Sequence, residues 1–401
     1  MRRIPYIRVG TTYYKLVKAP TLSGTFNEIL VPWSIETIRQ DHGKEYLGKI
    51  PKYDGFTCFP NHIDYKQEYS GFYNRYSPLS KKPEKGDVSY TINFVKHIFG
   101  KQYELGLDYL QLLFLKPIQT LPILCLVSKE RSTGKSTFLK WLKEFFENNL
   151  TYLTNEGFHS QFNSDWVSML LICIDEVLFN REELTERIKY LSTTNKNKIE
   201  AKGQDKKEVE FFGKFILCSN NEDSFIKIDA NETRFWVVKV NPIKSEDTDY
   251  LDKLVTEIPA FMDFLINRKL STTRQTRMWF TPNQIKTPAL KKLVQNNRNR
   301  VEKELANILI SVMEKFDLDE IHLCPLDALN ALSKTRIKTD LTQLRRLLKK
   351  EWKLTNQKNS ITYQKFVIWG DGDITLKEAK GRYFSINKDF LTQNFDELIP
   401  E

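Results

Sequence analysis

The stretch LPILCLVSKERSTGKSTF, residues 121–138, contains an apolar run, a polar loop and the start of a helix. This order is typical of a phosphate-binding loop, because a buried strand delivers the chain to a loop whose N–H groups, with the next helix N-terminus, face an anion. Lys135 adds a positive charge, and the Ser136 hydroxyl can reach Mg²⁺. Since Gly-Lys-Ser-Thr is a short motif, an ordinary strand–turn–helix is the alternative interpretation.

The loop departs from the pattern G-x-x-x-x-G-K-[ST]. Lys129 stands where the pattern has its first glycine, and Ser132 occupies a second position that is commonly glycine. We expect the missing first glycine to alter the loop geometry and to weaken nucleotide binding. The residues expected to surround the phosphates of a nucleotide are Lys129, Glu130, Arg131, Ser132, Thr133, Gly134, Lys135, Ser136 and Thr137.

Bulk properties narrow the class of protein. The 401 residues leave room for two or three domains, and 40% hydrophobic with 28% charged residues is ordinary for a soluble globular protein. A net charge of +10 suggests a polyanionic partner. The five cysteines form no C-x-x-C pair, so we expect buried free thiols. No apolar run approaches the roughly 18 residues of a membrane span and no signal peptide is visible, so a cytoplasmic protein without a membrane partner is expected.

The sequence predicts an α/β fold. Frequent proline and glycine in residues 1–80 predict short strands and loops, and apolar residues at three- and four-residue steps predict helix within 87–116. Residues 121–267 alternate helical stretches with apolar runs at 121–127, 170–174, 215–218 and 235–240. Such runs predict the strands of a parallel sheet that is buried on both faces.

The C-terminal part of the chain is expected to begin with a basic linker, residues 268–300, which carries nine Lys and Arg and no Asp or Glu. It is either solvated or faces nucleic acid. Residues 301–401 predict a winged-helix-like domain, with helices near 301–316, 325–333 and 338–350 and strands near 361–369 and 382–386. The third helix, within RIKTDLTQLRRLLKKEWK, is strongly basic and suits a DNA groove or backbone, although winged helices also bind proteins.

Two carboxylates follow the phosphate loop at a suitable distance. Forty residues after Lys135, the apolar run LLICI ends in Asp175 and Glu176. A nucleoside triphosphatase needs one carboxylate to hold Mg²⁺ together with Ser136, and a second one to polarise the attacking water. An acidic turn after a strand is the alternative.

Two further polar residues complete the pattern. The run FFGKFILC ends in Ser219, Asn220 and Asn221, where an amide can orient the water and sense the γ-phosphate. Arg234 follows fourteen residues after Asn220 and could reach the γ-phosphate of a neighbouring subunit. Its alternative is a surface arginine beside a strand. Each feature is weak alone, but the four in this order indicate a nucleoside triphosphatase.

This set of motifs resembles the superfamily 3 helicases, the hexameric ring motors of papillomavirus, polyomavirus and parvovirus replication. In detail it is more similar to the primase-helicase proteins of bacteriophages and mobile elements, especially those of Bacteroidetes. The similarity runs from about Asp54 to Val240, in YDGFTCFPNHIDY, LGLDYLQLLFLKP, LVSKERSTGKSTF, QFNSDW and FFGKFILCSNNED. It implies a P-loop, AAA+-like ATPase core that binds ATP and Mg²⁺ and assembles with copies of itself into a ring, expected to be a hexamer.

The resemblance also implies roles for single residues. Ser136 and Asp175 match the family's metal-binding residues, and the loop of residues 129–137 matches its nucleotide site. The catalytic positions of the family match Lys135, Glu176, which activates water, Asn220, which closes the C motif, and Arg234, the arginine finger.

The family carries a β-hairpin between its second and C motifs, whose basic tip grips DNA in the channel of the ring. IEAKGQDKKEVEF matches this hairpin, with Lys202 at the tip. Gly203 stands where viral members have histidine, so the grip is expected to be shared with Lys206 and Lys207. Gripping of the backbone by lysine is independent of sequence and sensitive to salt. A charged turn in solvent is the alternative.

We therefore predict an ATP-dependent DNA helicase of superfamily 3 type that moves 3′ to 5′ on single-stranded DNA and opens forked DNA, in phage or mobile-element replication within a bacterial cytoplasm. Residues 1–120 are expected to form an N-terminal mixed and helical collar, and residues 121–267 the ATPase core. Any primase or replication initiator would be a separate partner. Two alternatives stay open: an ATPase that remodels protein–DNA complexes without unwinding, and an origin-binding initiator that does not hydrolyse nucleotide.

Overall fold

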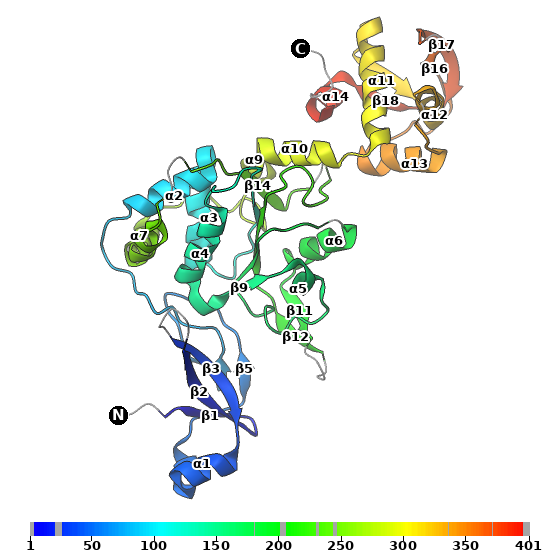
Figure 1. Ribbon diagram of the computed structural model, residues 1–401. Coiled ribbons are helices and arrows are strands. Elements are labelled where there is room, and N and C mark those ends of the chain that lie inside the picture. The colour runs from blue at the N-terminus through cyan, green and yellow to red at the C-terminus, as the bar shows by residue number, and fades with distance from the viewer. Residues whose placement is uncertain are drawn as a thin grey trace. The chain divides into compact units, whose positions relative to one another are not determined.

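The computed structural model describes residues 4–20, 26–179, 181–200, 206–229, 232–243, 247–335, 337–370 and 372–395. The chain divides into two compact units (Figure 1): residues 1–226 with 234–290, and residues 227–233 with 291–401. In the described residues, no helix has the length and apolar character needed to cross a membrane. The five cysteines are free, and the three within strands are buried, as expected.

A five-stranded parallel sheet organises the first unit, in the order β14–β8–β13–β10–β9. Its strands are β8 (Ile123–Val127), β9 (Leu150–Leu153), β10 (Leu171–Ile174), β13 (Lys214–Ser219) and β14 (Phe235–Lys239). The four apolar runs form strands as predicted, and every residue of β8, β10 and β13 is buried. The edge strand β9 was not predicted, because polar and exposed residues interrupt its apolar pattern.

Helices from both sides of the phosphate loop in the sequence share one apolar core with the sheet. They are α2 (Ser89–Phe99), α3 (Tyr103–Leu115), α4 (Lys135–Phe146), α7 (Tyr250–Thr256) and α8 (Ile258–Asn267). The helical pattern within 87–116 forms two helices joined by the 3₁₀ turn Gly100–Gln102, because Gly100 adopts a φ of +52° that ends α2.

The remaining elements of the first unit lie outside the parallel sheet. The described part of residues 1–80 contains the sheet β3–β2–β1–β4, the sheet β5–β7–β6 and one α-helix. Most of these strands are short as expected, but β2 and β3 have nine and eight residues. Their bounds are β1 (Tyr6–Val9), β2 (Thr12–Pro20), β3 (Phe26–Trp33), α1 (Ile35–His42), 3₁₀ helix Lys44–Lys49, β4 (Lys52–Tyr53), β5 (Gly55–Thr57), β6 (Glu68–Tyr69) and β7 (Phe72–Asn74). Later elements are 3₁₀ helix Glu147–Asn149, α5 (Asn155–His159), α6 (Glu182–Leu191), β11 (Lys196–Ile199), β12 (Lys207–Glu210) and α9 (Pro282–Ile285), followed by α10 (Pro288–Asn297), in which the division between the units falls.

Residues 268–290, which the charge pattern assigns to a basic linker, are packed in the first unit. Trp279 and Phe280 are buried in the main core. Arg268 points inward to Asp108 of α3, a carboxylate that is fully buried. A basic composition indicated solvent exposure, but it could not reveal that a buried acid in a distant helix neutralises one of these cations.

Asp108→Asn is expected to destabilise the first unit by on the order of 3 kcal/mol, because it leaves the Arg268 guanidinium buried beside a neutral group. Asp108 accepts hydrogen bonds from Thr272 Oγ1 at 2.6 Å and from the Ser271 N–H at 3.0 Å, in addition to Arg268 Nη1 at 2.5 Å. Urea unfolding measures the difference. Glu104→Gln is the control, since Glu104 pairs with the same arginine but is half exposed, and should cost less than about 1 kcal/mol.

The same pair predicts a pH dependence. Burial alone would raise the pKa of Asp108, but hydrogen bonds from Thr272, Ser271 and Arg268 outweigh it and hold the pKa below its usual value. A lowered folded-state pKa contributes stability above the unfolded pKa of about 3.9, and this stability is lost as the pH falls through the folded value. The difference between wild type and Asp108→Asn should be constant near neutral pH and shrink below about pH 4.

Among its described residues, the second unit contains the four α-helices α11 to α14 and two antiparallel strand pairs. Its elements are α11 (Arg300–Phe316), β15 (Glu320–Leu323), α12 (Pro325–Lys334), α13 (Leu341–Arg346) with the π-helical turn Leu347–Glu351, β16 (Ile361–Ile368), β17 (Ile374–Gly381), β18 (Phe384–Asn387) and α14 (Lys388–Phe395). The expected helices are present. The two expected strands do not pair with each other: β16 pairs with β17, and β18 pairs with β15. The polar sequence of β17 hid this strand.

Candidate nucleotide site

The candidate site lies at the carboxyl ends of three strands of the sheet, because parallel strands end on the same side. β13 lies between β8 and β10, so Ser219 and Asn220 lie between the phosphate loop and the acidic pair. Backbone hydrogen bonds continue beyond the strands: the Ser128 N–H donates to the Ser219 carbonyl at 3.2 Å, and the Val177 N–H donates to that of Cys218 at 2.8 Å. These hydrogen bonds bring the segments that follow β8, β13 and β10 next to one another.

The phosphate loop turns sharply before α4. Ser132 and Gly134 adopt φ values of +51° and +86°, and α4 begins at Lys135. The loop backbone is held from outside, since the ring N–H of His97 donates to the Thr133 carbonyl at 3.0 Å and the Ile243 N–H donates to the Ser132 carbonyl at 2.9 Å. Neither His97 nor Ile243 was recognisable as a support in the sequence, because both are distant from the loop in the chain.

Gly134→Ala is expected to weaken nucleotide binding about tenfold, because an L-residue is strained at this φ. A Cβ atom here would also lie 3.3 Å from side-chain atoms of Phe94 and Ile243. Titration with a fluorescent ATP analogue measures the effect. Gly372→Ala is the control, since Gly372 also has a positive φ but its Cβ would meet nothing within 4 Å. Unchanged binding in Gly134→Ala would contradict a role for this loop geometry.

Lys129 occupies the position of the absent first glycine with an ordinary backbone conformation. Its ammonium pairs with the Asp223 carboxylate at 2.7 Å, and its φ is not positive. Glycine is needed where the backbone is left-handed, and in this loop those positions are 132 and 134. The unusual position is therefore Ser132, which carries a side chain in a conformation that favours glycine.

Lys135, Ser136 and Asp175 come together at the carboxyl ends of the strands. The Lys135 ammonium is buried, donates to Thr133 Oγ1 at 3.0 Å, and has a pKa that burial lowers. The Ser136 hydroxyl donates to Asp175 Oδ2 at 2.9 Å. Hydroxyl and carboxylate oxygens suit Mg²⁺. The described residues contain no cluster of three or more metal-binding side chains, so the fit is to an ion that takes its other ligands from phosphate and water.

The acidic turn is supported by a residue that the sequence analysis missed. Glu176 has a φ of +56°, and the side chains of Asp175 and Glu176 are exposed. Asn155, the first residue of α5, donates from Nδ2 to the Glu176 carbonyl at 3.2 Å and accepts from the Leu178 N–H at 3.2 Å. The sequence carried no clear signal for this support, because Asn155 stands two residues after β9, a strand that was not predicted.

Arg234 is not brought to the phosphate loop of its own chain. It precedes β14, and its carbonyl accepts from the N–H of Ile123, the first residue of β8. The phosphate loop follows the other end of β8. Arg234 therefore lies at the amino-terminal end of the strands, whereas the remaining candidate residues lie at their carboxyl ends.

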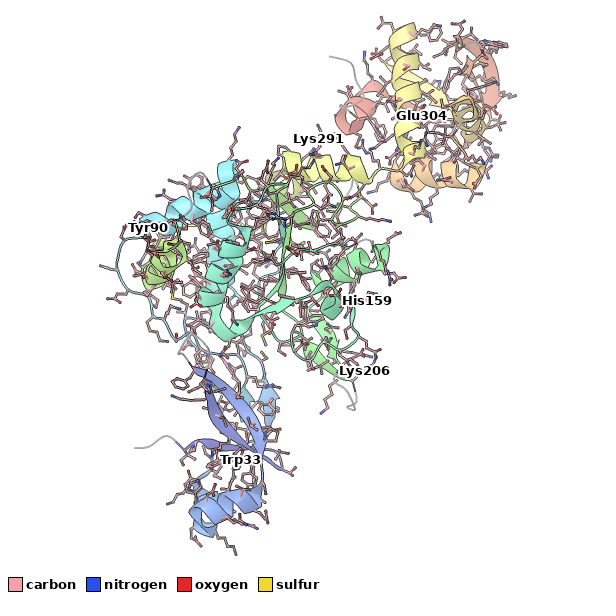
Figure 2. All side chains as sticks on the ribbon, in the orientation of Figure 1. Trp33, Tyr90, His159, Lys206, Lys291 and Glu304 are labelled. Atoms are coloured by element: carbon pink, nitrogen blue, oxygen red, sulfur yellow. The ribbon has the colours of Figure 1, made fainter. Side chains whose placement is uncertain are left out.

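Of the predicted DNA-binding lysines, Lys206 and Lys207 lie on the hairpin β11–β12, between β10 and β13 in the sequence. Lys206 pairs with Glu200 at 2.6 Å, and Lys207 is exposed at the start of β12; Figure 2 labels Lys206. Lys202 lies outside the described residues. The two strands of the hairpin are thus present, and the residues of its tip lie outside the described part of the chain.

Comparisons with known proteins bear on the fold. A model of a family of unknown function, DUF5906, matches residues 126–234, which begin in β8 and end at Arg234. A comparison with curated proteins found no match. The apo structure of the C-terminal region of NrS-1 (residues 305–718) matches with a TM-score of 0.64 and 16% identity, over 94% of this chain and 95% of that chain. The two chains share a fold.

Two other solved structures match. The A form apo structure of the same NrS-1 region has a TM-score of 0.62 and 17% identity, over 93% of this chain and 94% of that chain. A structure of JCV helicase with a bound thiazolopyridine compound has a TM-score of 0.30 and 14% identity, over 52% of this chain and 58% of that chain. At that TM-score the last match carries no argument about the fold.

Proposed function

We propose that this protein is an ATP-driven DNA helicase of superfamily 3 type that works as a ring of identical subunits. The observation that carries the proposal is the contact of the Ser136 hydroxyl with Asp175 at 2.9 Å, because it joins the phosphate loop to the acidic pair. The sheet order places Asn220 between these two groups. The carboxyl ends of the strands thus carry a hydroxyl, a buried ammonium, two carboxylates and an amide. This set of groups suits phosphoryl transfer to water.

Each residue has a role in that reaction. When bound, ATP would supply the phosphoryl group, and Mg²⁺ would neutralise the charge that develops on it. Lys135 and the N–H groups of the loop bind the phosphates, while Ser136 and Asp175 hold the metal ion. Glu176 polarises the attacking water, and Asn220 orients it.

The position of Arg234 supports assembly. Since Arg234 lies at the opposite end of the strands from its own phosphate loop, it can act only on nucleotide bound by another subunit. A closed ring gives every subunit such a neighbour, and a hexamer is our proposal for its size. In this ring, residues 1–120 form the collar and the hairpin lysines Lys202, Lys206 and Lys207 contact the DNA backbone.

The second unit is proposed to be winged-helix-like. Its order α11–β15–α12–α13–β16–β17 places a hairpin after the third helix, and exposed basic residues of the third helix and its π-helical turn, Arg345, Arg346, Lys349 and Lys350, suit a phosphate backbone. We place the protein in replication of a phage or mobile element in a bacterial cytoplasm, with 3′ to 5′ movement and a separate primase or initiator as partner.

The experiment that tests the proposal measures ATP hydrolysis with and without single-stranded DNA, and strand displacement on forked DNA. We expect DNA to stimulate hydrolysis and ATP to drive displacement, both weakening as salt is raised, because lysine–phosphate contacts release counterions. Stimulated hydrolysis without displacement would favour a remodelling ATPase. Nucleotide binding without hydrolysis on any DNA would favour the non-hydrolysing initiator, for which the atypical loop residues Lys129 and Ser132 are the supporting observation.

A further inference from the structure

The two strands of the hairpin β11–β12 are connected in different ways to the sheet strands that carry the candidate site. β12 continues through Phe211 and Phe212 into β13, the strand that ends at Ser219. β11 is reached from α6 and has no such direct continuation into β10, the strand that ends before Asp175. A link between β11 and β10 must therefore come from contacts through space.

Asn163 provides that contact from the segment between α5 and β10. Its side chain donates from Nδ2 to the Lys198 carbonyl at 2.8 Å and accepts at Oδ1 from the Glu200 N–H at 2.7 Å. Its own N–H donates to the Glu200 carbonyl at 3.2 Å. Lys198 and Glu200 are two residues apart, so these groups lie on one edge of β11, and Asn163 binds them as a neighbouring strand would.

On its other side, Asn163 holds the turn that leads into β10. Its carbonyl accepts from the N–H groups of Trp166 at 3.1 Å and Val167 at 2.9 Å. Trp166 is buried, with its ring centroid 6.3 Å from that of Phe158 and 6.4 Å from that of Phe211. One buried asparagine thus joins the edge of β11 to the segment that begins the strand of the acidic pair.

On the side of α6, no hydrogen bond to β11 is present among the described residues. A hollow of about 550 Å³ lies there, lined among others by Arg187 and Tyr190 of α6 and by Lys196 and Lys198 of β11. For β11 and Glu200, all hydrogen bonds found among the described residues to groups outside residues 194–210 are those with Asn163. Besides its pairing with β12, β11 is therefore held against the turn before β10 by the hydrogen bonds of Asn163.

We propose that Asn163 is a positioning residue that makes the hairpin and the hydrolysis site respond to each other. The inference rests on the proposed function, since that function assigns the hairpin to DNA and the acidic pair to ATP. Movement of β11 along its axis breaks two side-chain hydrogen bonds to Asn163 unless the turn before β10 moves with it. DNA bound at the hairpin thereby reaches Asp175 and Glu176 through β10, a connection that only a coupling measurement can establish.

The first measurement compares Asn163→Ala with wild type in ATP hydrolysis. Hydrolysis without DNA should stay within about twofold of wild type, while the stimulation by single-stranded DNA falls about tenfold, as expected for the loss of two hydrogen bonds. Gln161→Ala is the matched control, because Gln161 lines the same hollow and is exposed; it should behave as wild type. Equal loss of both rates, or loss of neither, would overturn the proposal.

The second measurement is amide hydrogen exchange over residues 196–200, with and without a non-hydrolysable ATP analogue and Mg²⁺. The analogue should slow exchange in wild type and in Gln161→Ala but not in Asn163→Ala, whereas a merely local structural role would leave this response intact. If the alanine variant does not fold, Asn163→Asp, which keeps the acceptor for Glu200 and loses the donor for Lys198, replaces it. Absence of the response in wild type overturns the inference. A response in wild type without DNA-stimulated hydrolysis would reject the proposed function while retaining the role of Asn163.

Discussion

Arg234→Ala is expected to reduce DNA-stimulated ATP hydrolysis by about 10³-fold or more, because an arginine that reaches the transferring phosphoryl group stabilises charge that develops in the transition state. Arg234 lies at the opposite end of the strands from its own phosphate loop, so in the proposed ring it would act on a neighbouring subunit. ATP affinity should change far less than the rate. Phosphate release at saturating ATP measures the loss.

Mixing distinguishes action between subunits from a structural defect. In an equal mixture of wild type and Arg234→Ala, some sites combine an intact phosphate loop with a neighbour that lacks the arginine, so activity should fall below the average of the two proteins. Thr233→Ala, at the exposed neighbouring position, should hydrolyse ATP normally and give an average in mixtures. A mixture of wild type and Arg234→Ala that also gives the simple average would show that each subunit works alone.

Glu176→Gln is expected to reduce hydrolysis about 10²- to 10⁴-fold, because a neutral amide cannot polarise the attacking water as a carboxylate does. Nucleotide binding should persist, since Ser136 and Asp175 remain to hold the metal ion. Phosphate release and titration with a fluorescent ATP analogue measure these two quantities separately.

The control for this variant is Glu182→Gln, which removes the same charge from an exposed position at the start of α6 and should leave hydrolysis unchanged. If Glu176→Gln lost nucleotide binding together with hydrolysis, Glu176 would be holding the metal ion instead of activating water. Hydrolysis at the rate of wild type would remove Glu176 from the reaction altogether.

Much of the candidate site could be predicted because its signals are local. The runs at β8, β10 and β13 are fully buried, and a buried strand must be apolar along its length, so each was visible in a few consecutive residues. The polar residues follow directly where the apolar runs end. Ser136 and Asp175 were expected to cooperate, and their side chains lie 2.9 Å apart.

Other parts of the site were not visible because they depend on partners distant in the chain. His97 supports the phosphate loop, Asn155 supports the acidic turn, and Asn163 holds β11. A single polar residue in a sequence carries no mark of the backbone group that it will meet. The same limit explains the packed stretch 268–290, where a buried carboxylate in α3 binds Arg268.

By itself, the sequence determined which segments are buried strands, where the phosphate-loop motif lies and which polar residues follow the strands, because alternation, apolar runs and short motifs act over neighbouring residues. Only the tertiary structure decided the strand order that places β13 between β8 and β10 and the pairing of β18 with β15. It also decided the position of Arg234 at the end of the strands opposite the phosphate loop. These features depend on which strand edges meet after the chain has folded, and many pairings satisfy the same local pattern.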